Sequence, residues 1–385
     1  MTDPERVAGL AGEITPLAVE LRRQLHRHPE AAHQEYRTTA LIADALDESG
    51  IEYHLRTPRT GLWVDIGGQP SIGFRADLDA LPITEPEDND PVSQNPGWMH
   101  ACGHDAHSAI AFGIASVLDR LELSSGVRLL FQPAEESFPG GAVEMVEDGL
   151  VDGLKGLIAF HIDPTLPTGR IGSRSGPMTA SADKFTLVLE GPGGHTARPH
   201  RTVDLIADAA RLMHELPGCM RRTIDARSPF TIAFGSIHGG EAGNVIPTRV
   251  EIEGTVRTLD GSVWGLLPAM MDKAVSSLLT ISDASYTLAY SQAVPPVVND
   301  AGLVGASTSG IAEMLGPDVV VPTEASMGGE DFSNYLARVP GALFRLGSVG
   351  SGGDLHSPSF NLDEASIGFG IRAGVAALLG IQQRL

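Results

Sequence analysis

The sequence predicts an α/β fold, in which a mostly parallel sheet with helices on both faces is interrupted by a smaller α+β domain. Short apolar segments typical of strands alternate with amphipathic segments typical of helices, which favours a parallel sheet flanked by helices. The pattern changes around Pro177 and resumes after Pro296. A chain of 385 residues is also longer than one compact domain usually needs. We therefore expect one domain over residues 1–178 and 293–385 and an inserted domain over 179–292.

The larger domain is predicted to begin with helices. Leu17, Leu21 and Leu25 recur at helical spacing within residues 14–49, and a second helical stretch covers 38–46. Strands and helices then alternate along the chain. The predicted strands are 61–66, 71–74, 127–131 and 157–160, and the predicted helices are 106–121, 141–149 and 365–379.

The inserted domain is predicted to hold two helices against about four antiparallel strands. Residues 184–189 alternate between apolar and polar side chains as a half-exposed strand does, and residues 203–216 form an amphipathic helical pattern. The other predicted elements are strands 231–237, 249–258 and 285–290 and helix 268–279.

Composition and charge exclude some classes of partner. The formal net charge is −21, and a strongly acidic chain repels phosphate backbones and anionic lipid surfaces. No apolar run approaches the ~20 residues of a membrane-spanning helix, and charges interrupt the N-terminal residues, unlike a secretory signal. Cys102 and Cys219 are too few for a disulfide framework. We expect a cytoplasmic protein with no nucleic-acid or membrane partner.

The densest cluster of candidate metal ligands is the segment MHACGHDAH, residues 99–107. Thiolate and neutral imidazole both bind zinc-like divalent metals, and the single glycine between Cys102 and His104 allows both side chains to face one ion. Asp105 is expected to cap the helix that follows. The alternative is that these histidines only decorate the start of a helix.

Further candidates follow the ends of predicted strands, where sites form in open α/β sheets. Glu135 and Glu136 follow the strand VRLLFQ and a proline, and one can bind metal while its neighbour takes a proton from water. The alternative for such a pair is a solvated surface. His161 ends the strand LIAFH, and Asp77 and Asp79 end the strand GFRADLD. The remaining candidate is His356, in a loop rich in glycine and serine.

These segments, in this order, resemble the M20 metallopeptidase/aminoacylase family. The subgroup that they resemble contains N-acyl-L-amino acid amidohydrolases, hippurate hydrolases and auxin-conjugate hydrolases. The similarity covers essentially the whole chain. It includes the segments LHRHPE at 25–30, GGHTARPH at 193–200, GNVIP at 243–247 and GGEDF at 328–332.

The resemblance implies two divalent metal ions per subunit, of zinc, manganese, nickel or cobalt. The ligands that it implies are Cys102, His104, Glu136, His161 and His356. It also implies that Glu135 is the general base and that Asp79 supports the ligands from behind. Asp77 stands where other branches of the family have a histidine ligand, so the bridging atom stays open.

The resemblance further implies that the inserted domain is a lid and dimerisation domain. His195 matches a histidine that polarises the scissile carbonyl, often from the partner subunit of a homodimer, and a loop histidine is the alternative. Asn244 and Arg257 match residues that hold the carbonyl or carboxylate of the substrate. For Arg257, a surface ion pair is the alternative.

The implied activity is metal-dependent hydrolysis of the amide bond of small N-acyl amino acids or related conjugates. Two relatives in chemistry stay open, an N-acetyl-diaminopimelate deacetylase and an aminobenzoyl-glutamate hydrolase. A noncatalytic dimeric binding scaffold is the alternative from another class. The presence of Glu135 beside five candidate ligands argues against a scaffold, because a scaffold needs no base.

Overall fold

The computed structural model describes residues 3–350 and 352–384, and these form two compact units. The first unit comprises the described parts of Met1–Gly176, Val298–Glu324 and Asp331–Leu385. The second comprises Pro177–Val297 and Ala325–Glu330, so the chain enters it twice. Two short strands, β7 (Gly176–Thr179) and β14 (Val297–Asn299), include the residues where the chain passes from one unit to the other.

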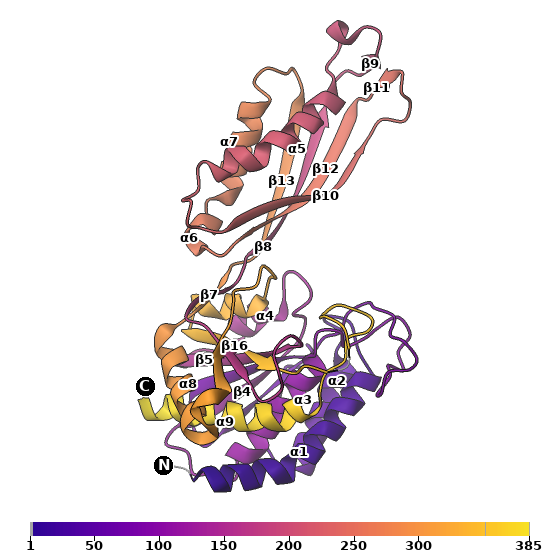
Figure 1. Ribbon diagram of the computed structural model, residues 1–385. Coiled ribbons are helices and arrows are strands. Elements are labelled where there is room, and N and C mark those ends of the chain that lie inside the picture. The colour runs from indigo at the N-terminus through magenta and orange to yellow at the C-terminus, as the bar shows by residue number, and fades with distance from the viewer. Residues whose placement is uncertain (1–2, 351, 385) are drawn as a thin grey trace. The chain divides into compact units, whose positions relative to one another are not determined.

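The first unit is built on an eight-stranded sheet in the order β1-β2-β4-β3-β5-β16-β6-β15 (Figure 1). Strands β4, β3, β5 and β16 at its centre are parallel neighbours, which confirms the predicted mostly parallel sheet. Antiparallel pairings join β1 to β2, β2 to β4 and β16 to β6. The strands are β1 (His54–Leu55), β2 (Leu62–Ile66), β3 (Pro70–Asp77), β4 (Gly126–Gln132), β5 (Gly156–Asp163), β6 (Ile171–Ser173), β15 (Val320–Pro322) and β16 (Gly341–Gly347).

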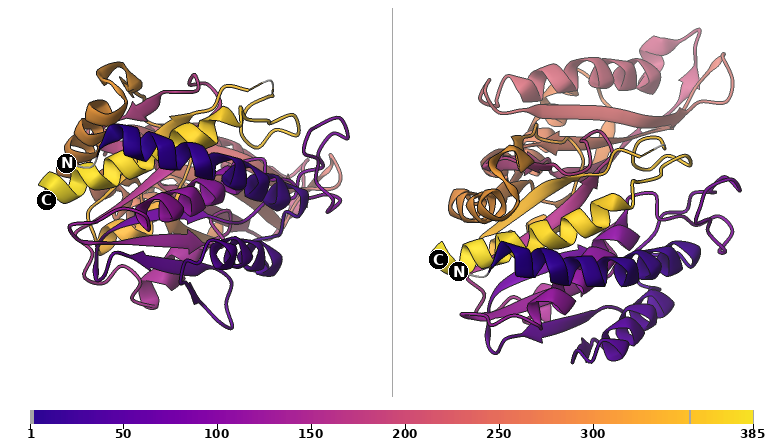
Figure 2. Two further views of the ribbon diagram at one scale, coloured as in Figure 1. Left: turned by 90° about the horizontal axis from the view of Figure 1, so that it is seen from below. Right: turned by 60° about the horizontal axis from the view of Figure 1, so that its bottom comes forward.

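Three helices, α1 (Pro4–Arg27), α3 (His104–Leu118) and α9 (Ala365–Arg384), pack side by side beneath this sheet (Figures 1 and 2). Their buried side chains form one core with those of the sheet, where Phe160 packs edge-on against Phe74 and Phe344. Figure 1 shows α4 on the opposite side of the sheet from α9. The other helical segments of the unit are α2 (Tyr36–Glu48), α4 (Gly141–Glu147), α8 (Ala301–Leu315) and the 3-10 turns η2 (Pro317–Val319) and η3 (Asp331–Ala337).

Helix α1 begins earlier than the leucine spacing predicts. Asp3 caps it by accepting the N–H of Glu5 at 3.0 Å, and Pro4 occupies the first helical position, where its missing N–H costs nothing. Val7 and Ile14 extend the buried face toward the N-terminus. The helix therefore runs from its cap signals rather than from the first leucine.

Helix α9 is the one described helix that is long and apolar enough to cross a membrane by length and composition, which the sequence analysis did not anticipate. In the structure 78% of its apolar window is buried, and it packs against α1, α3 and α8. Its apolar residues serve the core of the first unit.

The second unit holds a four-stranded antiparallel sheet in the order β10-β12-β8-β13. Helices α5 and α7 bury their apolar faces against it in a separate core, as the sequence predicts. Helix α5 continues past the expected end through Pro217. The elements are β8 (Ala182–Glu190), β9 (Gly194–His195), η1 (Pro199–Arg201), α5 (Leu205–Arg221), β10 (Phe230–Gly239), β11 (Val245–Ile246), β12 (Arg249–Thr258), α6 (Gly261–Trp264), α7 (Leu267–Leu278) and β13 (Ser285–Val294).

Candidate metal centre

Cys102 and His104 flank Gly103 in the turn that starts α3. Gly103 has φ +82°, in the left-handed region that glycine adopts without strain. A Cβ at this position would lie 3.0 Å from the side chain of Ile162 on β5. Glycine therefore allows both the turn and the close approach of β5, and the ligand atoms of Cys102, His104 and His161 lie within 4.8 Å of one another.

The expectation that Asp105 caps α3 is wrong. The helix begins one residue before it, with Gly103 as the capping residue and no side-chain cap. The buried Asp105 carboxylate instead contacts Arg22 and His26, each at 2.8 Å. Burial opposes its charge, but Arg22 and His26 hold the pKa of Asp105 well below its usual range. Asp105 thus ties the start of α3 to α1.

Three of the other predicted ligands, His161, His356 and Glu136, lie near the thiol of Cys102. Its Sγ lies 3.5 Å from Nε2 of His161 and 3.3 Å from Nε2 of His356. Nε2 of His356 is in turn 3.2 Å from Oε1 of Glu136. The backbone N–H of His356 donates to the carbonyl of Ala101 at 2.8 Å, which holds the C-terminal loop against the Cys102 turn. Residues 254 positions apart therefore share one small volume.

His104, the fifth predicted ligand, has a nitrogen available for a metal. Its Nδ1 donates to the backbone carbonyl of Asp79 at 2.9 Å. Its Nε2 is buried, and among the described residues it has no hydrogen-bond partner. This nitrogen lies 3.9 Å from Oε2 of Glu135, the predicted base. A buried nitrogen without a partner is costly unless a ligand completes it, and a divalent metal would do so.

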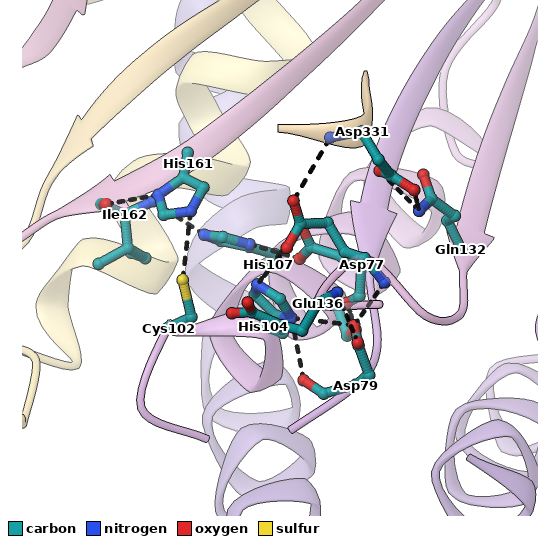
Figure 3. A network of polar contacts seen from close by, with 12 residues as sticks. Asp77, Asp79, Cys102, His104, His107, Gln132, Glu136, His161, Ile162 and Asp331 are labelled. Carbon is teal, nitrogen blue, oxygen red and sulfur yellow. Dashed lines mark hydrogen bonds and ion pairs between the residues drawn. The ribbon is translucent and has the colours of Figure 1, made fainter. Parts of the chain in front are cut away.

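His161 is oriented through the backbone of its neighbour Ile162 (Figure 3). Nδ1 of His161 donates to the carbonyl of Ile162 at 2.7 Å, so its Nε2 carries the lone pair that faces Cys102. The N–H of Ile162 donates to Nε2 of His107 at 2.8 Å, and Nδ1 of His107 therefore donates to Asp77 at 2.6 Å. The sequence analysis gave His107 no role. Its signal is its position three residues after His104, on the same face of α3.

Asp77 stands where other branches of the M20 family have a histidine ligand, but here its carboxylate contacts the side chains next to the candidate ligands. Its Oδ1 accepts from His107, and its Oδ2 accepts from the buried guanidinium of Arg75 at 2.6 Å. Oδ2 is also 3.8 Å from Nε2 of His104. Because both oxygens already accept strong hydrogen bonds, the contacts of Asp77 are those of a residue that orients ligands.

The Glu135-Glu136 pair is held by Asp79. Strand β4 ends at Gln132, and the turn that follows carries both glutamates. Oδ1 of Asp79 accepts the N–H of Glu135 at 2.9 Å, and Oδ2 accepts the N–H of Glu136 at 2.8 Å. One buried carboxylate thus fixes two consecutive peptide groups, and a carboxylate oxygen of each glutamate lies within 4.8 Å of a ring nitrogen of His104.

Two imidazoles of the centre carry raised pKa values because anionic groups surround them. Hydrogen bonds to Cys102 and Glu136 raise the pKa of His356 to about 10. Burial opposes the charge of His104, but the carboxylate of Asp77 and the contact with Asp79 raise its pKa well above the usual value. In each case the neighbouring groups stabilise the protonated, positively charged form of the imidazole.

The third imidazole and the thiol shift in other directions. Burial, followed by the nearby charges of His107 and Arg345, holds the pKa of His161 well below its usual value, so its lone pair is free at neutral pH. Burial raises the pKa of the Cys102 thiol. The donor set of one thiol, three imidazoles and a carboxylate fits a borderline or soft divalent ion, because such an ion supplies the positive charge that this cluster attracts.

His195, Asn244 and Arg257 belong to the second unit. His195 lies on β9 opposite Val245 of β11, and the N–H of Thr196 donates to the carbonyl of Asn244 at 3.2 Å, so His195 and Asn244 are neighbours. Arg257 lies on β12 and donates to the carbonyl of Met327 at 2.9 Å. No ion pair of Arg257 is seen within residues 3–350 and 352–384.

Known proteins resemble this chain over most of its length. Peptidase family M20/M25/M40 matches residues 73–380. A Rhodococcus jostii protein named "Putative glutamate--cysteine ligase 2-3" is 43% identical over 93% of this chain, which spans only 46% of that protein. The N-acyl-L-amino acid amidohydrolase of Geobacillus stearothermophilus is 38% identical over 77% of this chain and 81% of that enzyme. The crystal structure of a Bacillus subtilis dinuclear metal-binding peptidase of the M20 family superimposes with a TM-score of 0.85, at 32% identity, over 97% of this chain and 100% of that chain.

Proposed function

The chain belongs to peptidase family M20/M25/M40, and we infer from this that it hydrolyses the amide bond of small N-acyl amino acids in a metal-dependent reaction. The products are a carboxylic acid and an amino acid. The observation that carries this proposal is a run of overlapping donor groups, in which the buried Cys102, His104 and His161 adjoin the partly exposed Glu136 and His356 and the neighbouring Glu135. The name of the Geobacillus relative supports the substrate class, and the dinuclear centre of the Bacillus peptidase supports two ions.

We assign the metal ligands to five residues: Cys102, His104, Glu136, His161 and His356. When bound, divalent ions lower the pKa of water from about 15.7 toward roughly 7 and polarise the carbonyl of the substrate. Glu135 takes the proton of the attacking water and delivers it to the leaving amine. His195 donates to the developing oxyanion, and Asn244 and Arg257 hold the carbonyl or carboxylate of the substrate.

The proposed roles of the two adjacent glutamates, Glu135 as the base and Glu136 as a metal ligand, predict different effects of mutation. Glu135→Gln removes the base and leaves every ligand in place, so we expect full metal content and a fall in kcat of about 10²–10⁴-fold. Glu136→Gln removes a ligand, so we expect loss of bound metal. Elemental analysis and hydrolysis of N-acetyl and N-benzoyl amino acids measure both effects.

These measurements distinguish the proposed amidohydrolase from a binding scaffold and from two related hydrolases. Near-normal turnover of Glu135→Gln contradicts its role as the base. A wild-type protein that binds metal but hydrolyses no acyl amino acid, with or without a chelator, favours the binding scaffold. Activity confined to N-acetyl-diaminopimelate or aminobenzoyl-glutamate in the same panel favours one of those two hydrolases.

We further propose that the protein is a cytoplasmic homodimer whose second unit acts as the lid and dimerisation domain. The support for this is the family resemblance of the 193–200 and 243–247 segments and the absence of a disulfide between Cys102 and Cys219. Light scattering of the purified chain tests the dimer.

A further inference from the structure

Three consecutive peptide N–H groups in the turn after β4 are each held by a buried carboxylate. Asp79 accepts those of Glu135 and Glu136, as described above. The N–H that precedes them, on Ala134, donates at 2.8 Å to Oε1 of Glu35. Glu35 lies between α1 and α2, 99 positions earlier in the chain. The backbone that presents the base and a ligand is thus fixed at three successive points.

Glu35 has the contacts of a residue that holds backbone. Its side chain is fully buried, and it forms no ion pair in the described part of the chain. Oε1 also accepts the N–H of His33 at 2.9 Å, and Oε2 accepts the hydroxyl of Thr60 at 2.7 Å. Burial and the nearby charge of Asp79 raise the pKa of Glu35 to about 7. Burying a carboxyl group without a cation is costly. The three hydrogen bonds offset this cost by holding two backbone N–H groups and a hydroxyl in place, which an apolar side chain could not do.

The residue that Glu35 holds has an unusual backbone. Ala134 has φ +55°, in the left-handed region that non-glycine residues enter at a cost of roughly 1–2 kcal/mol. On its other side, the carbonyl of Ala134 accepts the N–H of Gly141 at 2.9 Å. Rotation of Ala134 back to the ordinary region would swing the next residue, Glu135, away from His104 and Asp331, whose N–H lies 3.4 Å from Glu135.

We propose that Glu35 is a positioning residue: by holding Ala134 in the left-handed conformation, it aims the carboxylates of Glu135 and Glu136 into the metal centre. This inference rests on the proposed function for its catalytic consequence. Its structural part, the placement of a metal ligand, does not depend on which substrate is cleaved.

Glu30 provides a matched control for the stability that Glu35 contributes. Its carboxylate is half-buried, less than that of Glu35, and likewise accepts N–H groups, those of Arg37 at 3.1 Å and Thr38 at 2.7 Å. These belong to the first turn of α2 and have no contact with the metal centre. Glu30→Ala should therefore lower thermal stability and leave kcat, KM and metal affinity unchanged.

The test compares Glu35→Ala with Glu35→Gln. The alanine variant leaves the N–H of Ala134 without its acceptor, and a misplacement of about 1 Å can cost up to about 100-fold in rate, so we expect kcat to fall at least about tenfold with little change in KM. The glutamine variant keeps an oxygen for the N–H groups of Ala134 and His33 and can donate to the Thr60 hydroxyl. It should retain nearly normal kcat.

A second substitution probes the backbone directly. Glycine enters the left-handed region at no steric cost, so Ala134→Gly placed in the Glu35→Ala background should recover part of the lost kcat. An effect through general destabilisation would not be repaired by a glycine, which increases the freedom of the unfolded chain.

Metal affinity separates this inference from the proposed reaction. Because Glu136 follows Ala134 by two residues, Glu35→Ala should weaken the binding of zinc alone at least about tenfold, measured by competition with a chelating dye and without any substrate. If wild type hydrolyses no acyl amino acid but this affinity falls, the proposed function fails and the positioning role stands. If Glu35→Ala resembles Glu30→Ala, with normal kcat and metal affinity at a lower melting temperature, the positioning role is overturned. Should Glu35→Ala not fold, Glu35→Asp, which shortens the reach by one methylene, must show the same losses at smaller size.

Discussion

At the scale of single residues, two of the proposed ligand histidines, His104 and His161, are oriented through the ring nitrogen that would not bind metal. His104 and His161 each donate one nitrogen to a backbone carbonyl, which leaves the other nitrogen for the ion. Hydrogen bonds to Cys102 and Glu136 raise the pKa of His356, and the carboxylate of Asp77 raises that of His104 against the effect of burial, so both imidazoles hold protons at neutral pH. An incoming ion must displace these protons, so metal affinity and pH are coupled.

We therefore expect metal binding to release protons. Both histidine pKa values are raised in the metal-free protein, so the protons are fully bound below neutral pH and are lost as pH rises through the raised values. Affinity for zinc should accordingly weaken as pH falls from about 8 to about 6. Calorimetry in buffers of different ionisation enthalpy measures the released protons. A binding enthalpy that is identical in all buffers contradicts the expectation.

At the scale of elements, the close crossing of α8 and α9 depends on glycine. A Cβ at Gly310 of α8 would meet the carbonyl oxygen of Ala376 and, at 2.7 Å, the Cα of Gly380, both backbone atoms of α9. Backbone cannot give way as the end of a flexible side chain can. The position of α9, which packs against α1, α3 and the sheet, is thus set partly by the absence of a methyl group at Gly310.

This crossing can be tested with two substitutions in one helix. Gly310→Ala should destabilise the protein by about 1–3 kcal/mol, because α8 and α9 must move apart. Gly305, also on α8, has no described atom within 4 Å of its would-be Cβ, so Gly305→Ala should instead stabilise by roughly 0.5–1 kcal/mol. Denaturant unfolding of both variants measures the difference. Equal effects in the two variants would show that α8 and α9 have room for a methyl group at position 310.

At the scale of the whole molecule, the formal charge of −21 includes the carboxylates of Glu135 and Glu136 in the candidate metal centre. Divalent ions would bind the folded centre and have no such site in the unfolded chain, where the five proposed ligands lie scattered between positions 102 and 356. Bound metal therefore stabilises the folded protein by mass action.

Removal of metal should lower thermal stability. Ions at a hundredfold excess over Kd contribute about 2.7 kcal/mol, so a chelator should lower the melting temperature by a few degrees, and added zinc should restore it. The Cys102→Ala variant, which lacks the thiol at the centre of the cluster, serves as the control and should show a smaller shift. An equal shift in Cys102→Ala would remove Cys102 from the ligand set.

The class of the fold and most of the local elements could be predicted from the amino-acid sequence alone. Strand and helix periods are local patterns, so strands β3, β4 and β5 of the first unit and the two-helix, four-strand layer of the second were predicted within a few residues, whereas β16, β15 and α8 were given no range. Errors fell at ends, where caps decide: Asp3 starts α1 early, and Gly103 rather than Asp105 precedes α3. The sequence also singled out the five candidate ligands and Glu135, by residue type, spacing and resemblance.

Some of the groups that orient those candidates could be identified from the folded chain and not from the sequence. Glu35 and the Arg22–Asp105 pair show no local pattern that separates them from ordinary polar residues. Their roles come from contacts between segments far apart in the chain, such as the 99 positions between Glu35 and Ala134. Such contacts depend on how strands and helices pack, and packing is a property of the folded chain that no short window of sequence contains.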